Sequence, residues 1–196
     1  TLSKKSSDEQ MEFIRWHALS SYVRWYEYIE RKEIKCLEFI NNLPEIALKW
    51  AEENHYSPKS SSDIMDIGDE MIKRFKPDII FVFAPLTYLK NNFLNELISS
   101  LGKKPKLIAW YGANCGDENI FRYFNLTLSN STRLVNNLNK LNISAELLQH
   151  SFDPIILDRV NTNNVKKNRI AFFGNLDFKS KDFRDRTEFI YQISKE

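Results

Sequence analysis

The stretch Asp78-Ile-Ile-Phe-Val-Phe-Ala84 decides the fold class of this chain. After the charged Asp78, the stretch is an unbroken apolar run. Such runs are typical of strands that are covered on both faces in a parallel sheet. The longest apolar run, from Ile79 to Leu86, is far too short to span a bilayer as a helix. We therefore predict a buried strand at 78–84.

Helix and strand patterns alternate after this run. The expected elements on this side are a helix at 91–101 that stops at Gly102, strands at 106–111, 125–129 and 145–149, and a helix at 132–141. Strands and helices that alternate at this spacing indicate a parallel, doubly wound sheet with right-handed crossovers. The expected fold class is α/β, with a Rossmann-like parallel sheet.

The residues before this run predict helices around one short strand. Apolar residues at three- and four-residue steps predict a long helix at 8–31. The alternation in Ile34-Lys-Cys-Leu-Glu-Phe-Ile40 predicts a strand, and Pro44 suits the first turn of a further helix. Another helix is expected at 63–75. It ends before Pro77, because the residue that precedes a proline is disfavoured in helical backbone.

The chain changes character at 151–168, where the polar run Asn161-Thr-Asn-Asn-Val-Lys-Lys-Asn168 follows a turn-forming Asp-Pro pair. We interpret this stretch as a linker between an N-terminal domain at 1–150 and a second α/β domain. In the second domain, one strand and one helix at 182–194 cannot form a core alone. We therefore expect 169–196 to be the start of an incomplete domain, and the first strand of the N-terminal domain to be absent as well.

Composition argues against several functional classes. Lys and Arg total 28 against 26 Asp and Glu, and the basic residues are dispersed, which does not favour nucleic-acid binding. The sequence has no Asp-x-Asp motif and no His/Cys cluster at metal-ligand spacing, so we expect no metal and no cofactor. The two cysteines, Cys36 and Cys115, are far apart and fit a reduced, cytoplasmic compartment.

Polar residues follow the expected strands at their carboxyl ends, where open α/β sheets bind ligands. His150 is a candidate hydrogen-bond donor or general base, and Asp117 or Glu118 is a candidate base. If the edges of two such domains face each other, a ligand binds between them. The stretches that this rule selects are 84–88, 111–117, 129–131 and 150–153 in the first domain, and 174–176 in the second.

Several short motifs occur in a distinctive order. Trp50-Ala-Glu52 precedes the strand at 78–84, and Ile108-Ala-Trp-Tyr111 is a strand that ends in aromatic residues. His150-Ser-Phe-Asp-Pro154 lies before the crossover, and Ala171-Phe-Phe-Gly-Asn175 is a strand and turn with arginines downstream. Over nearly its whole length the chain thus resembles the glycosyltransferases with two Rossmann-like domains, the GT-B fold, and particularly their CgeB-like spore-maturation group.

The resemblance implies a reaction and a set of residues. The enzyme would be bacterial and metal-independent, and would transfer a sugar from a nucleotide-diphosphate donor to a hydroxyl of a glycan, lipid-linked or protein acceptor, as in polysaccharide biosynthesis. Peripheral association with a membrane would accompany a lipid-linked acceptor. The chain alone would be inactive, because most of the donor domain lies outside it. The implied residues are His150 and Asp117 for catalysis, Gly174, Asn175, Arg184 and Arg186 for the donor, and Tyr111, Gly112 and Asn114 for the acceptor.

Each assignment has a structural alternative. His150 suits a hinge that caps backbone carbonyls, Asp117 a solvated loop, and Gly174 an ordinary strand-to-helix turn, while one of Arg184 and Arg186 is expected on a solvated helix face. For the whole protein, one alternative is a non-catalytic α/β module for ligand binding or assembly, which keeps the fold without the chemistry. The other is a nucleotide-sugar epimerase of the same fold.

Overall fold

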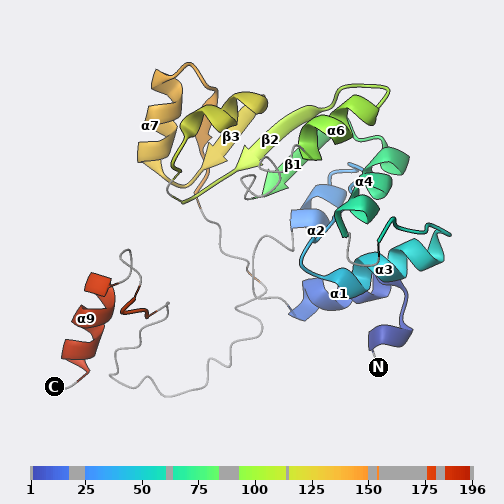
Figure 1. Ribbon diagram of the computed structural model, residues 1–196, viewed down its shortest axis with the longest axis horizontal. Helices are drawn as coiled ribbons and strands as arrows, with labels where there is room; N and C mark the ends of the chain where they lie inside the picture. Colours follow the sequence, from blue (N-terminus) through green and yellow to red (C-terminus); the bar gives the residue numbers. More distant parts are fainter. Residues whose placement is uncertain are drawn as a thin grey trace. The chain divides into compact units, whose positions relative to one another are not determined.

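The chain divides into two compact units, Thr1–Ile156 and Leu157–Glu196. Each unit is described by itself. The first unit has a sheet half and a helical half (Figure 1). Among the described residues, no helix is both long and apolar enough to cross a membrane. The computed structural model describes residues 2–17, 25–60, 64–83, 93–113, 115–149, 154, 176–179 and 184–194.

The sheet half is built on four parallel strands, which confirms the α/β fold class. The strands pair in the order β1-β2-β3-β4, so each strand lies beside its neighbour in sequence (Figure 1). This arrangement is consistent with a Rossmann-like α/β fold. The strands are β1 (Ile79–Phe83), β2 (Lys106–Trp110), β3 (Leu126–Ser129) and β4 (Ala145–Leu147).

The helices of the sheet half lie between the strands in sequence. They are α6 (Phe93–Ser100), the 3-10 helix η3 (Glu118–Tyr123) and α7 (Thr132–Lys140). The helix α7 starts where Ser131 Oγ accepts a hydrogen bond from Leu134 N at 3.3 Å, a typical N-cap. The 3-10 helix η3 is an element that the sequence analysis missed.

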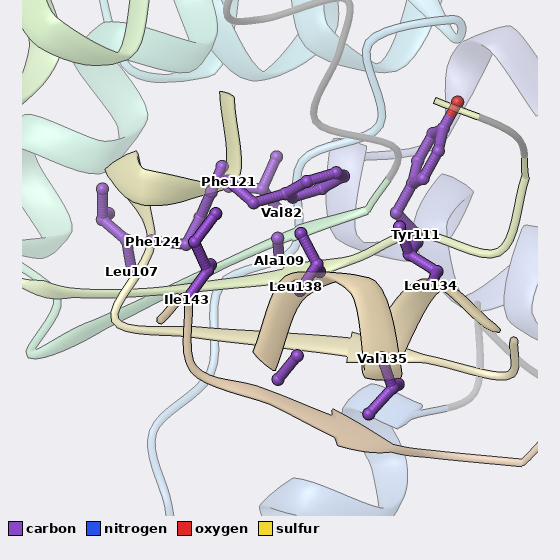
Figure 2. Packing of buried hydrophobic residues seen from close by; sticks show 11 residues of the cluster. Val82, Leu107, Ala109, Tyr111, Phe121, Phe124, Leu134, Val135, Leu138 and Ile143 are labelled. Atoms are coloured by element: carbon purple, nitrogen blue, oxygen red, sulfur yellow. The ribbon is translucent and has the colours of Figure 1, made fainter. Parts of the chain in front are cut away.

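One register row explains where the sheet is buried. Val82, Ala109, Thr127 and Ala145 are paired across the four strands, and all four side chains are buried. Because side chains alternate between the two faces of a strand, this row marks one face of the sheet. Figure 2 shows Phe121 and Phe124 near η3 and Leu138 of α7 in the same cluster of buried residues. The main core of the chain therefore lies between this face and the elements η3 and α7.

One face of β1 is exposed, although cover on both faces was expected. The run at 78–84 was expected to be covered on both faces, but Ile79, Phe81 and Phe83 remain exposed, Ile79 to 57%. The cover here is partial, because Phe81 meets Trp25 edge-on at 5.3 Å between ring centroids and Phe83 stacks on Trp110 at 4.6 Å. In the described part of the sheet the strands follow one another in sequence order rather than doubly wound order, and right-handed crossovers between such strands lie on one face, which leaves the other face of β1 with only partial cover.

The helical half has its own smaller core. Ala47 and Ala51 of α3 pack with Ile67 and Met71 of α4. Pro44 occupies the first turn of α3, as the sequence predicted. The elements of this half are the 3-10 helix η1 (Leu2–Lys4) and the helices α1 (Ser7–His17), α2 (Trp25–Glu30), α3 (Pro44–Glu53) and α4 (Ile64–Phe75). The long helix expected at 8–31 is tested only at its ends, since 18–24 lie outside the described residues.

The strand expected at 34–40 is absent, which is a second correction. Within the described residues this stretch pairs with no strand. Its alternating apolar residues, Leu37 and Phe39, instead pack against the core of the helical half. The Phe39 ring lies so close to Gly68 that a Cβ on the glycine would be 2.6 Å from two ring carbons. The alternation thus reflects burial against helices rather than pairing in a sheet.

The second unit is described only around α9 (Arg184–Ile193). Thr187 is buried, and its Oγ1 accepts a hydrogen bond from Asp177 N at 2.9 Å. Phe178 and Tyr191 form an edge-on ring contact. The helix expected at 182–194 is therefore present, whereas the strand and turn expected at 169–175 lie outside the described residues. The linker expected at 151–168 is also outside them, apart from residue 154.

Candidate functional site

The carboxyl ends of β2 and β3 bring two loops together. The loop after β2 begins at Tyr111, whose backbone N–H donates to the Leu128 carbonyl at 3.0 Å. The loop after β3 consists of Asn130 and Ser131, which lead directly into α7. Because the strands are parallel and adjacent, both loops lie at the same edge of the sheet, where ligands of such folds bind.

Gly112 and Asn130 form the closest contact at this edge. A Cβ on Gly112 would lie 2.5 Å from Asn130 Oδ1 and 2.7 Å from Cη2 of the Trp110 ring. Only glycine fits here without a shift of its neighbours, so its role is close approach. Asn130 Oδ1 is buried and has no hydrogen-bond partner among the described residues. A buried carbonyl oxygen without a partner is uncommon and marks this position as a candidate binding group.

The two serines beside Asn130 have structural roles. Ser129 is fully buried, and its Oγ accepts a hydrogen bond from Ser131 N at 3.0 Å. Ser131 in turn caps α7 through its own hydroxyl. These bonds fix the backbone around Asn130, so its side chain is held at the edge by the start of the helix. The sequence pattern singles out the stretch 129–131 but gives no role to Asn130, because the contact of this residue with Gly112 depends on the pairing of β2 with β3.

Tyr111 belongs to the core more than to the loop. Its ring is buried and lies 5.6 Å from the Phe121 ring, centroid to centroid. Figure 2 shows the ring at one end of the cluster, with its hydroxyl pointing away from it. Burial raises the pKa of Tyr111, and the neighbouring Cys115 adds to the rise. The phenol therefore stays protonated at neutral pH and keeps a polar atom at the edge of the site.

Asp117 serves as a helix cap. Its Oδ1 accepts hydrogen bonds from Asn119 N at 3.0 Å and from Asn119 Nδ2 at 3.1 Å, at the start of η3. Glu118, the other candidate base, accepts a hydrogen bond from Asn137 Nδ2 at 2.9 Å and so ties η3 to α7. Both carboxylates therefore have structural roles, and neither is placed beside Asn130 by any of these bonds.

The remaining candidates belong to the second unit or lie outside the described residues. Arg184 and Arg186 are exposed in the first turn of α9, and Arg184 Nε donates to the Phe178 carbonyl at 3.3 Å. They belong to the second unit, whose residues are described by themselves. His150, Asn114, Gly174 and Asn175 lie outside the described residues. Of the sequence-predicted residues, the structure thus brings together Tyr111 and Gly112, and it adds Asn130.

Metal ligation and known relatives give no further assignment. Across the part of the chain that the structure describes, no three His, Cys, Asp or Glu side chains are grouped as metal ligands would be. No protein-family model, no curated protein and no solved structure matches the chain. The function is therefore inferred from the fold and the geometry of this edge.

Proposed function

We propose that this chain takes part in glycosyl transfer of the GT-B type, with its sheet half on the acceptor side. The reaction transfers a sugar from a nucleotide-diphosphate donor to a hydroxyl of a glycan, lipid-linked or protein acceptor. The observation that carries the proposal is the contact of Gly112 with Asn130 at the carboxyl ends of β2 and β3. It supports a ligand-binding edge, since polar groups at this edge of a parallel sheet are the usual ligand contacts.

The chemistry of Asn130 suits a hydroxyl acceptor. A side-chain amide offers one acceptor oxygen and two N–H donors, so it can pair with a hydroxyl in either direction. Because Gly112 has no side chain, this amide lies directly against the backbone of the loop after β2. The hydroxyl of Tyr111 provides a further polar group at the same strand end. We assign these three residues to acceptor binding.

The proton and the leaving group require residues from elsewhere in the chain. We assign His150, which follows β4, as the base that takes the proton of the acceptor hydroxyl. Gly174 and Asn175 would offer backbone N–H groups to the leaving diphosphate, and Arg184 or Arg186 a guanidinium. In this proposal the positive groups of the protein stabilise the leaving charge without a metal.

The proposed compartment is the cytoplasm. Cys36 and Cys115 are both free thiols, and free thiols are usual where glutathione and thioredoxin keep proteins reduced. A lipid-linked acceptor would bring the enzyme to the inner membrane surface during the reaction.

One observation favours a second candidate, a non-catalytic α/β module. Asp117 and Glu118, the carboxylates nearest the edge in sequence, both form hydrogen bonds that hold η3 in place. A domain that binds a ligand without transferring a group needs no base at this position. The two candidates differ in one measurable property, which is turnover of the donor in the presence of an acceptor.

The test compares two glycines of the same loop in the complete product of the gene. Gly112→Ala places a Cβ against Asn130, whereas Gly116→Ala has no atom within 4 Å of the new Cβ. Release of nucleotide from UDP-, GDP-, CMP- and dTDP-sugars would be measured with glycan acceptors. We expect Gly112→Ala to raise the KM for the acceptor by about tenfold, roughly the loss of one good hydrogen bond, and Gly116→Ala to leave it unchanged.

The outcomes separate the candidates. Binding of donor or glycan by calorimetry, without turnover in the unmodified protein, supports the module. Absence of both binding and turnover with every donor contradicts glycosyl transfer. Turnover of a donor without any acceptor, giving an isomeric nucleotide sugar, identifies an epimerase.

A further inference from the structure

A cavity of about 90 Å³ lies within the helical half, and none of its lining residues belongs to the strands. Roughly 10–15 Å³ of such volume holds one water, so the space corresponds to roughly six to nine waters. It is therefore large enough for a small organic molecule. The residues that line it come from α1, α2, α3, α4 and the segment 34–40, and include Arg15, Tyr26, Cys36, Glu38, Trp50 and Met71.

Arg15 and Glu38 are the main polar groups of this cavity. Arg15 Nε donates to Glu38 Oε2 at 3.0 Å, and their side chains are only 13% and 18% exposed. The Arg15 guanidinium also lies over the Tyr26 ring, 3.7 Å from its centroid. This stacking and the single hydrogen bond hold the guanidinium plane in a fixed orientation.

Among the described residues, most hydrogen-bonding groups of this pair have no protein partner. A guanidinium has five N–H donors, and in the described part of the chain only Nε of Arg15 has an acceptor. A largely buried ion pair is stabilising only when its remaining donors and acceptors are satisfied. The Nη groups of Arg15 and the free lone pairs of Glu38 are thus available to a molecule in the cavity.

The charges of the cavity select the class of that molecule. The lining carries one cation, Arg15, and two carboxylates, Glu38 and Asp8. An anion would meet a net negative wall, and it would compete with Glu38 for the guanidinium. A hydroxyl can accept from Arg15 and donate to Glu38 at the same time, which matches the pair without breaking it.

We propose that this cavity binds a neutral, hydroxyl-bearing small molecule, of the polyol or small monosaccharide class, through Arg15 and Glu38. Apolar carbon–hydrogen faces of the ligand would pack against Trp50, which also lines the cavity. The proposal does not rest on the proposed function, because the cavity uses none of the residues assigned to glycosyl transfer.

The structure provides a matched control for Arg15. Arg74 also pairs through Nε with a glutamate, Glu70, at 2.7 Å, and also lies over an aromatic ring, that of Trp50, at 5.5 Å. Unlike Arg15 it does not line the cavity, and its Nη1 already donates to the Asn54 carbonyl at 3.1 Å. Replacing either arginine by lysine therefore removes a guanidinium that is paired with a glutamate and lies over an aromatic ring, but only Arg15 itself lines the cavity, whereas Arg74 contacts the Trp50 ring that lines it.

The experiment is a titration of the whole chain with erythritol and D-xylose, monitored by NMR. The reporters are the arginine Nε–H signals and the tryptophan indole N–H signals. We expect the Arg15 and Trp50 signals to shift and saturate at millimolar ligand. Arg15→Lys should weaken binding by about tenfold, as expected for a lost charged hydrogen bond, and Arg74→Lys by less than about twofold.

A second variant keeps the test valid if Arg15→Lys does not fold. Cys36→Leu enlarges a side chain that lines the cavity and leaves Arg15 and Glu38 in place, so it should abolish binding while the Arg15 Nε–H signal persists. Three results would overturn the proposal. They are the absence of a saturable shift with both erythritol and D-xylose, tighter binding of acetate or phosphate than of these two ligands, and equal loss of binding in Arg15→Lys and Arg74→Lys.

Discussion

The two halves of the first unit are held together in different ways. In the sheet half, large apolar side chains such as Phe121 and Leu138 fill the space beside a regular register of strands. In the helical half, two of the four buried core residues are alanines, and polar side chains such as Arg15, Glu38 and Asp66 take interior positions. The core of the sheet half is thus formed by large apolar side chains, whereas the interior of the helical half also contains charged pairs.

The largest expected effect tests the sheet half. Phe121 is fully buried, so Phe121→Ala leaves a cavity and should lower the free energy of unfolding by about 3–5 kcal/mol. Tyr123→Ala is the matched control, because Tyr123 lies in the same 3-10 helix but is exposed, and its loss should change stability by less than about 0.5 kcal/mol. Both changes in the free energy of unfolding would be measured by urea denaturation. Equal effects would show that η3 does not bury Phe121.

The next largest loss of stability is expected from breaking the polar side-chain contacts of the helical half. The buried Asp66 accepts hydrogen bonds from Tyr56 OH at 2.8 Å and from Lys59 N at 3.0 Å. Asp66→Asn removes the charge from this network and should cost about 1–3 kcal/mol at pH 7. Glu12→Gln, on the exposed side of α1, is the control and should be neutral. If Asp66→Asn is also neutral, specific polar pairs do not determine this half.

The pKa of Asp66 leads us to expect that the stability of the protein depends on pH. Burial raises the pKa of Asp66, but the bonds from Lys59 and Tyr56 outweigh it and the pKa lies below its ordinary value of 3.8. Because the folded pKa is the lower one, this carboxylate stabilises the fold above about pH 4, and its contribution is lost as the pH falls through the folded pKa. The stability difference between the wild type and Asp66→Asn should therefore shrink below pH 4.

A smaller effect tests how the segment 34–40 is attached. Gly68→Ala gains up to about 1 kcal/mol of helix propensity. It also forces a Cβ into the Phe39 ring, and such overpacking costs about 1–3 kcal/mol. We expect a net loss of about 1 kcal/mol in thermal or urea denaturation. Gly102→Ala, with no atom within 4 Å of its Cβ, should not destabilise the protein, and a stabilised Gly68→Ala would show that Phe39 packs elsewhere.

The smallest expected change in stability comes from replacing two buried threonines. Thr127 Oγ1 has no hydrogen-bond partner among the described residues, whereas Thr187 Oγ1 accepts from Asp177 N. Thr127→Val removes a hydroxyl whose burial is unfavourable and should stabilise the sheet half by up to about 1 kcal/mol. Thr187→Val should destabilise the second unit, as measured by hydrogen exchange of α9. A destabilised Thr127→Val would mean that this hydroxyl has a partner.

Most elements of the fold could be predicted because their signals are local. The runs at β1 and β2 and the proline at the start of α3 each identify an element within a few residues. The stretch 34–40 has the same local signal as a strand, but it packs on helices, because alternation reports burial on one side and not the partner. The exposed face of β1 was missed for a related reason, since an apolar run does not show which faces of a strand the helices cover.

The candidate sites were less predictable, because they depend on contacts between distant residues. Gly112 could be selected from its place after a strand, but its contact with Asn130 follows from the pairing of β2 with β3. Arg15 and Glu38 are separated by 23 positions, and nothing in either local pattern names the other as its partner. The sequence did not show that Asp117 caps η3, because a loop carboxylate and a helix cap have the same residue type.

The unit formed by β3, α7 and β4 also bears on how the chain folds. Both strands and the helix between them lie within 126–147, and the helix packs on both strands. The loops that must close to form this unit are short, so little chain entropy is lost before its apolar contacts form. We therefore expect it to be the folding nucleus, on which β2 and then β1 add as each preceding crossover closes.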